Sequence, residues 1–148
     1  MKNARVSVNR KIQHREILKE TADYKNLING YRERVLTQQT RTIRLLGRKS
    51  SAKIIHTLLG FEVQASYKRI QCPDMVTARY LRLFSDLGCH SIKLPYDPTL
   101  TEQLIPGFEA IIVRIKEKVR DLFPRDSSTQ QYVIRTIYGI IRRQLASS

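Results

Sequence analysis

Apolar residues recur every three or four positions through the first third of the chain, which is the spacing of one face of an α-helix. The pattern predicts a helix from about Ile12 to Leu46 that ends at Gly47, and Gly30 marks a point at which it could break. An unbroken helix of this kind would be about 50 Å long. The stripe comprises Ile17, Thr21, Tyr24, Ile28, Tyr31, Val35, Ile43 and Leu46.

A short second helix is predicted directly after the basic turn at residues 47–51. It would extend from Ala52 to Leu59, with Ser50 or Ser51 as its N-cap and Gly60 as its end. A helix, a glycine-containing turn and a helix are also the order of a DNA-reading helix-turn-helix. The second helix offers few polar side chains for base contacts, so phosphate contact by the turn is favoured over base reading.

The apolar spacing changes to strict alternation in residues 61–72, which predicts a strand. The phase shifts by one residue at Lys68-Arg69, which indicates a bulge or a hairpin turn there. A helix from Met75 to Leu87 follows, with Asp74 as its N-cap, and residues 92–96 alternate again as a second strand. This order predicts a βαβ unit, whose two strands are parallel.

The last third of the chain predicts amphipathic helices. A capping box of Thr99 and Glu102 opens the first of them, and Ser128 with Gln131 caps the last. The stripe of the first comprises Leu104, Phe108, Ile111, Ile112, Ile115, Val119 and Leu122, and that of the last comprises Ile134, Ile137, Tyr138, Ile141 and Leu145.

These elements predict a helix-rich α+β fold with one βαβ unit, whose small sheet is covered by amphipathic helices, and a long N-terminal helix. The alternative is an all-α bundle in which residues 61–72 form a loop. Residues 1–47 are expected to form a basic arm and the long helix, and residues 48–148 a compact α+β domain.

Positive charge is concentrated at the beginning of the chain. The sequence has 27 Lys and Arg against 13 Asp and Glu, a net charge of +14. Residues 1–53 hold 14 basic and 4 acidic residues, a net charge of +10, whereas residues 54–100 have a net charge of only +1. A small domain this basic favours a polyanionic partner, and nucleic acid, DNA or RNA, is the commonest.

The predicted contact site is the Arg41-to-Lys53 end of the first third, together with Lys11 of the basic arm that precedes the helix. Its cations would bind backbone phosphates, and the serine hydroxyl and N–H groups at a helix start suit a phosphate as well. The candidate residues are Lys11, Arg41, Arg44, Arg48, Lys49, Ser50 and Lys53.

Three functions are compatible with this pattern. The first is a non-enzymatic nucleic-acid-binding protein. The second is a small basic subunit of a nucleoprotein complex, of a CRISPR-effector-like or ribosome-associated kind, or a homo-oligomer. The third is a metal-dependent nuclease, in which Asp74 and Asp97 would follow neighbouring parallel strands and hold Mg²⁺ at one sheet edge.

The composition bears on cofactors and cellular location but indicates no particular reaction. Cys72 and Cys89 form no disulfide framework, and no paired zinc-ligand spacing occurs, so neither a metal nor a cofactor is expected. No stretch reaches the length of a membrane span or of a signal-peptide core. We therefore expect a cytoplasmic protein that does not bind a membrane.

Overall fold

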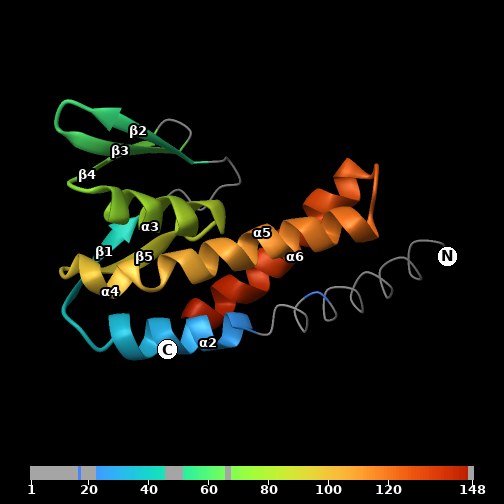
Figure 1. The fold of residues 1–148 in the computed structure, drawn as a ribbon, viewed down its shortest axis with the longest axis horizontal. Coiled ribbons are helices and arrows are strands. Elements are labelled where there is room, and N and C mark those ends of the chain that lie inside the picture. The colour runs from blue at the N-terminus through green and yellow to red at the C-terminus, as the bar shows by residue number, and fades with distance from the viewer. Residues whose placement is uncertain (1–16, 18–22, 46–51, 66–67, 147–148) are drawn as a thin grey trace.

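The fold is helix-rich and mixed α+β, as the sequence predicts. The computed structural model describes residue 17 and residues 23–45, 52–65 and 68–146. Two antiparallel sheets, one of two strands and one of three, lie on either side of a central helix, α3 (Met75–Asp86), and two long helices extend to one side (Figure 1).

Among the described residues, the predicted N-terminal helix is wrong from Leu36 onward. Helix α2 (Asp23–Gly30) continues as the π-helix η1 (Tyr31–Val35), and the chain then turns into strand β1 (Thr40–Arg44). Strand β1 pairs antiparallel with β5 (Ser91–Pro95), with Ile43 opposite Ile92. Buried Ile28, Tyr31 and Val35 belong to the common core.

The predicted second helix is also wrong, because residues 53–57 form a strand. Strands β2 (Lys53–Thr57), β3 (Gly60–Ala65) and β4 (Lys68–Cys72) form an antiparallel meander in that spatial order. Ala65 pairs with Lys68, so the phase shift noted in the sequence is a hairpin turn rather than a bulge.

The helix predicted after Asp74 is confirmed as α3, and Asp74 is its N-cap, with Oδ1 accepting the backbone N–H of Thr77 at 2.6 Å. The parallel pairing predicted for the strands before and after α3 is not confirmed. Strands β4 and β5 flank α3 in the chain but lie in different sheets, and every strand pair among the described residues is antiparallel. No βαβ unit therefore forms.

The C-terminal helices follow the predicted stripes, but their caps differ. Helix α4 (Pro98–Glu102) is capped by Asp97, so Thr99 lies inside it rather than before it. Helices α5 (Ile105–Leu122) and α6 (Ser127–Ala146) come next, and Asp126 accepts from the backbone N–H of Thr129 at the start of α6, in place of the predicted Ser128 cap.

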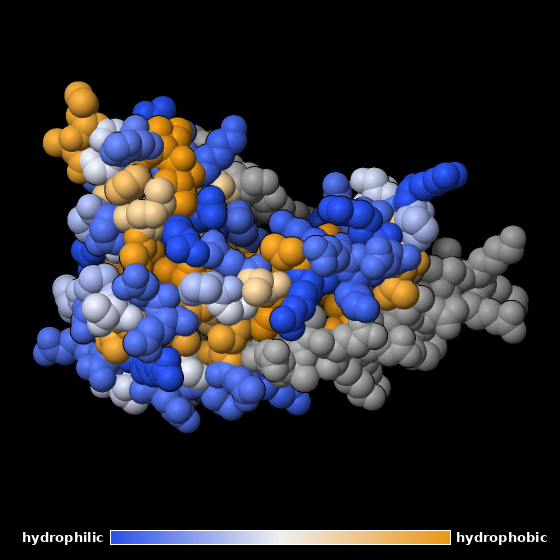
Figure 2. Space-filling model, viewed as in Figure 1, coloured by the Kyte–Doolittle hydropathy of each residue, from blue (hydrophilic) through white to orange (hydrophobic). Residues whose placement is uncertain are grey.

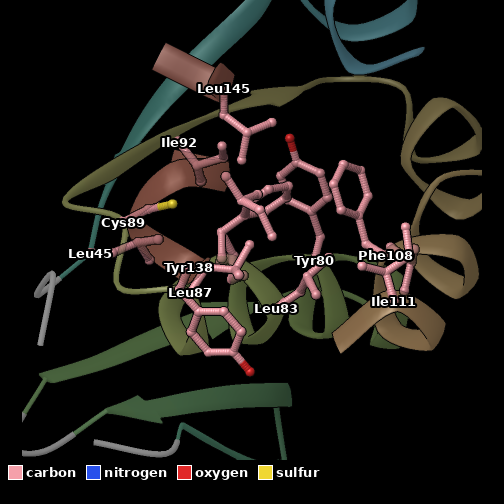
Figure 3. Close-up of a cluster of buried hydrophobic side chains, with 14 of the residues drawn as sticks. Leu45, Tyr80, Leu83, Leu87, Cys89, Ile92, Phe108, Ile111, Tyr138 and Leu145 are labelled. Carbon is pink, nitrogen blue, oxygen red and sulfur yellow. The ribbon is translucent and has the colours of Figure 1, made fainter. Parts of the chain in front are cut away.

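One core joins the helices and both sheets. Figure 3 shows Tyr80, Leu83 and Leu87 of the α3 region grouped with Ile92 of β5 and Tyr138 of α6. Ile115, Val119 and Ile137 are fully buried between α5 and α6. The burial of these stripes explains why the amphipathic pattern predicted both long helices correctly.

One part of the apolar pattern remains in solvent. Leu58 and Leu59 lie in the turn between β2 and β3, where Leu58 is fully exposed and Leu59 is 85% exposed. Figure 2 shows hydrophobic surface at this corner of the molecule. Within the described residues, no helix has both the length and the hydropathy required to span a membrane.

Candidate nucleic-acid interface

The two sheets carry all three of the predicted phosphate-contacting residues that the structure describes. Arg41 and Arg44 lie on β1 and Lys53 begins β2, and all three side chains are exposed. The other predicted residues, Lys11, Arg48, Lys49 and Ser50, lie outside the described part of the chain.

In the two-stranded sheet, the pairing of β1 with β5 brings Lys93 of β5 beside β1. Thr42 lies opposite Lys93, and the Lys93 ammonium donates to Thr42 Oγ1 at 2.6 Å. Because directly opposed residues of an antiparallel pair share a face, Lys93 and Thr42 lie on the same face as the neighbouring pair of Arg44 and Ser91.

A lysine joins the two sheets at their basic ends. The Lys68 ammonium, at the start of β4, donates to the backbone carbonyl of Arg44 at 2.7 Å. This contact places a cation of the three-stranded sheet directly beside β1. It uses the Arg44 backbone, so the Arg44 guanidinium stays available to a ligand.

Two further cations share one face of the three-stranded sheet. Lys53 pairs with Gln64, which pairs in turn with Arg69, so the three residues form one row across β2, β3 and β4. Two strand spacings separate Lys53 from Arg69 in this row, about 10 Å. Arg69 and Lys53 are exposed at its two ends.

Within the described strands themselves, only one residue is acidic. The five described strands contain six basic residues and one acidic residue, Glu62. Glu62 Oε1 lies 3.7 Å from Arg69 Nε and also accepts from Gln64 Nε2 at 3.0 Å, so this carboxylate already has two polar partners. The strands therefore carry an excess of five positive charges.

Arg41 lies toward the other end of the three-stranded sheet. Burial raises the pKa of the Cys72 thiol to about 11, and the nearby Arg41 guanidinium opposes that rise. Cys72 pairs with Phe61 at the end of the sheet remote from Lys68. The two arginines of β1 thus lie toward different ends of the three-stranded sheet, Arg44 beside Lys68 and Arg41 near Cys72.

The structure removes the premise of a helix-turn-helix in residues 40–59. The described residues before and after the basic turn belong to β1 and β2, not to two helices. A recognition helix cannot be formed by residues that occupy a strand, so base reading by this segment loses its structural basis.

The structure also removes the premise of a two-aspartate metal site. Asp74 and Asp97 follow strands of different sheets, and each caps a helix. Hydrogen bonds from the Thr99 hydroxyl and backbone N–H lower the pKa of Asp97. In the described ranges, no group of three or more His, Cys, Asp or Glu could hold a metal ion.

Lys68, Arg69 and Lys93 belong to this basic surface but were not predicted from the sequence. The predicted bulge or hairpin turn falls on Lys68 and Arg69, and reading it as the tip of a basic hairpin would have found them, although the structure places both residues in β4. No local signal identifies Lys93, because its place beside Thr42 depends on pairing between strands about fifty residues apart.

Comparisons with protein-family models, with curated proteins and with solved structures give no match for this chain.

Proposed function

We propose that the chain is a non-enzymatic nucleic-acid-binding protein that holds the phosphate backbone with the cations of its two sheets. The observation that carries the proposal is the excess of five positive charges on the strands, where the one carboxylate is already engaged. Cations at strand positions are held at fixed spacing, which suits the regular repeat of phosphates along a duplex.

The salt dependence of binding tests this proposal. We expect affinity for labelled duplex DNA, duplex RNA and single strands to fall steeply as salt rises, since each neutralised phosphate releases a counterion. The test variant is Arg41→Gln/Arg44→Gln/Lys53→Gln, whose three side chains are exposed. On duplex DNA the log–log salt slope should become shallower by up to about 2.7.

A matched variant controls for net charge. Lys116→Gln/Arg120→Gln/Arg135→Gln removes three exposed cations from α5 and α6 and leaves the strands unchanged. It should retain nearly the wild-type slope. Equal loss of affinity in both triple variants, or no binding of any polynucleotide by the wild type at low ionic strength, would contradict the proposal.

A role as a small subunit of a larger nucleoprotein assembly is the second candidate. The exposed Leu58 and Leu59 favour it, because fully solvated neighbouring leucines are typical of surfaces that other molecules cover. Sedimentation of the wild type and of Leu58→Ser/Leu59→Ser, each with and without nucleic acid, would show whether these leucines support association.

A further inference from the structure

A cavity of about 460 Å³ opens between the C-terminal end of α6, strand β5 and the helix η1. This volume lies within the range of about 300–1,000 Å³ found for small-molecule sites. The cavity is separate from the cations at β2 and β4. None of Arg41, Arg44 and Lys53, the residues replaced in Arg41→Gln/Arg44→Gln/Lys53→Gln (the strand triple variant), lines it.

The charge of the cavity wall has one sign. His90, Lys93, Arg142 and Arg143 line it, and no carboxylate does so among the described residues. None of these four takes part in the ion pairs found in the described ranges, which join Arg69 to Glu62 and two arginines of α3 to Glu109. Helix α6 itself contains three arginines and no acidic residue.

Two of the cations are held in place by hydrogen bonds to neutral groups. Arg142 Nη1 donates to the backbone carbonyl of Leu87 at 2.5 Å, and Lys93 Nζ donates to Thr42 Oγ1 at 2.6 Å. A guanidinium has five N–H donors, so this bond leaves Arg142 with others for a ligand. Cations fixed before binding lose less conformational freedom when an anion arrives.

Another part of the wall is apolar. Leu36, Ile92 and Leu145 line it, and Figure 3 shows Ile92 and Leu145 close together at the junction of β5 and α6. An inorganic anion would leave this surface in contact with water. A ligand with a charged head and an organic body would cover it.

We infer that this cavity binds an organic phosphate of about mononucleotide size, with its phosphate on Arg142, Arg143 and Lys93 and its organic part on the apolar wall. Two adjacent arginines suit a phosphate because each planar guanidinium can donate two parallel hydrogen bonds to its oxygens. Either a free nucleotide or the 5′-phosphorylated end of a nucleic-acid strand would supply such a phosphate with its organic part.

Calorimetric titration of the full chain tests the inference with defined probes. These are AMP, inorganic phosphate, and a six-nucleotide strand with and without a 5′-phosphate. Arg143→Gln removes an exposed cation of the cavity wall, and Arg135→Gln removes an exposed cation from the same helix outside the cavity. Lys93→Gln is a second cavity variant, and thermal melts verify that all three variants fold.

We expect saturable binding of AMP or of the 5′-phosphorylated strand, and the preferred probe identifies the source of the phosphate. Arg143→Gln and Lys93→Gln should each weaken this binding about tenfold, as expected for one charge-assisted hydrogen bond, and Arg135→Gln should not. Failure of all probes to bind at millimolar concentration, equal weakening by Arg135→Gln, or no gain of AMP over inorganic phosphate would overturn the inference. The strand triple variant should retain AMP binding, which separates this outcome from a failure of the proposed function.

Discussion

Phe84 lies at the centre of a group of aromatic rings that connects three parts of the chain. Its ring centroid lies 4.8 Å from that of Tyr80, 5.7 Å from that of Phe108 and 6.1 Å from that of Tyr31. The contacts with Tyr80 and Phe108 are edge-to-face, which is the favoured geometry for aromatic pairs. Phe84 thereby links α3 to α5 and to the N-terminal segment.

Replacement of this ring should be among the most costly single changes in the molecule. Phe84 is 1% exposed, so Phe84→Ala would leave a cavity among three aromatic neighbours. We expect it to lower the free energy of unfolding by about 3–5 kcal/mol. Urea denaturation, with the m-value checked for constancy, measures the change.

Two further variants make this expectation specific. Phe84→Leu keeps much of the volume and should lose clearly less stability than Phe84→Ala. Tyr132→Ala removes an aromatic ring that is 49% exposed on α6, and should change stability by less than about 1 kcal/mol. Similar losses in Phe84→Ala and Tyr132→Ala would contradict the central role of Phe84.

At the scale of elements, two glycines should respond to alanine in opposite directions. Gly60, where β3 begins, has φ of +127°, and a Cβ there would lie 2.9 Å from the Cys72 carbonyl oxygen. Gly139 lies inside α6, where the nearest atom to a new Cβ would be 3.5 Å away. The first position requires glycine, and the second only tolerates it.

We therefore expect Gly60→Ala to destabilise the protein by about 1–3 kcal/mol, because alanine rarely adopts a positive φ and would also clash. Gly139→Ala should stabilise it by about 0.5–1 kcal/mol, because alanine is the better helix former. Thermal melts of the two single variants measure both signs. A stabilising effect of Gly60→Ala would show that the turn can rearrange.

The same elements show where sequence reasoning succeeds. Residues 75–87 are long enough for a helical period to be distinguished from a strand period, and this helix was predicted with nearly the observed bounds. The helical period after Thr99 was equally clear, but the structure divides that stretch into α4 and α5. The one-residue phase shift predicted either a bulge or a hairpin turn near Lys68, and the pairing of Ala65 with Lys68 shows the hairpin.

Short apolar runs account for the failures. In residues 52–59, Ile54 and Leu58 are four apart, as are Ile55 and Leu59, which imitates a helix. The two leucines instead occupy an exposed turn, so half of that pattern came from residues that pack against nothing described. The β-branched residues 54, 55 and 57 were the better guide, since they favour a strand.

The candidate interface could be predicted only as far as its local charge. Arg41, Arg44 and Lys53 were named from charge density alone, and the structure shows them exposed. Their spatial relation to Lys93 comes from pairing of β1 with β5, which neither segment specifies on its own. The same non-local pairing replaced the predicted βαβ unit, because β5 joined β1 instead of β4.

At the scale of the whole molecule, charge and titratable groups are segregated. No lysine or arginine in the described part of the chain is buried, while several groups that ionise in alkali are inside. Burial is the largest cause that raises the pKa of both Cys72 and Cys89 to about 11, from an ordinary value of 9.0. It likewise raises the pKa of Tyr31 and Tyr138 to about 12, from 10.0.

This arrangement predicts a loss of stability in alkali with a defined sign. The raised pKa values mean that the folded state keeps the thiols neutral at a pH where the unfolded chain has already ionised them. The stabilisation is complete below pH 9 and is lost as the pH rises toward 11, with the tyrosines contributing over the next interval. Each thiol adds at most about 1.4 kcal/mol per pH unit to the slope.

Urea unfolding at pH 7, 9, 10 and 11 measures this slope, and single cysteine variants assign it. Cys72→Ala and Cys89→Ala should each be less stable at pH 7, because each removes a buried sulfur, yet each should lose stability less steeply above pH 9. Lysine titration is common to all three proteins, so it cancels in the comparison. Parallel curves for the wild type and both variants would mean that the thiols ionise as easily in the folded protein as in the unfolded chain, and that their burial does not govern the alkaline limit of the fold.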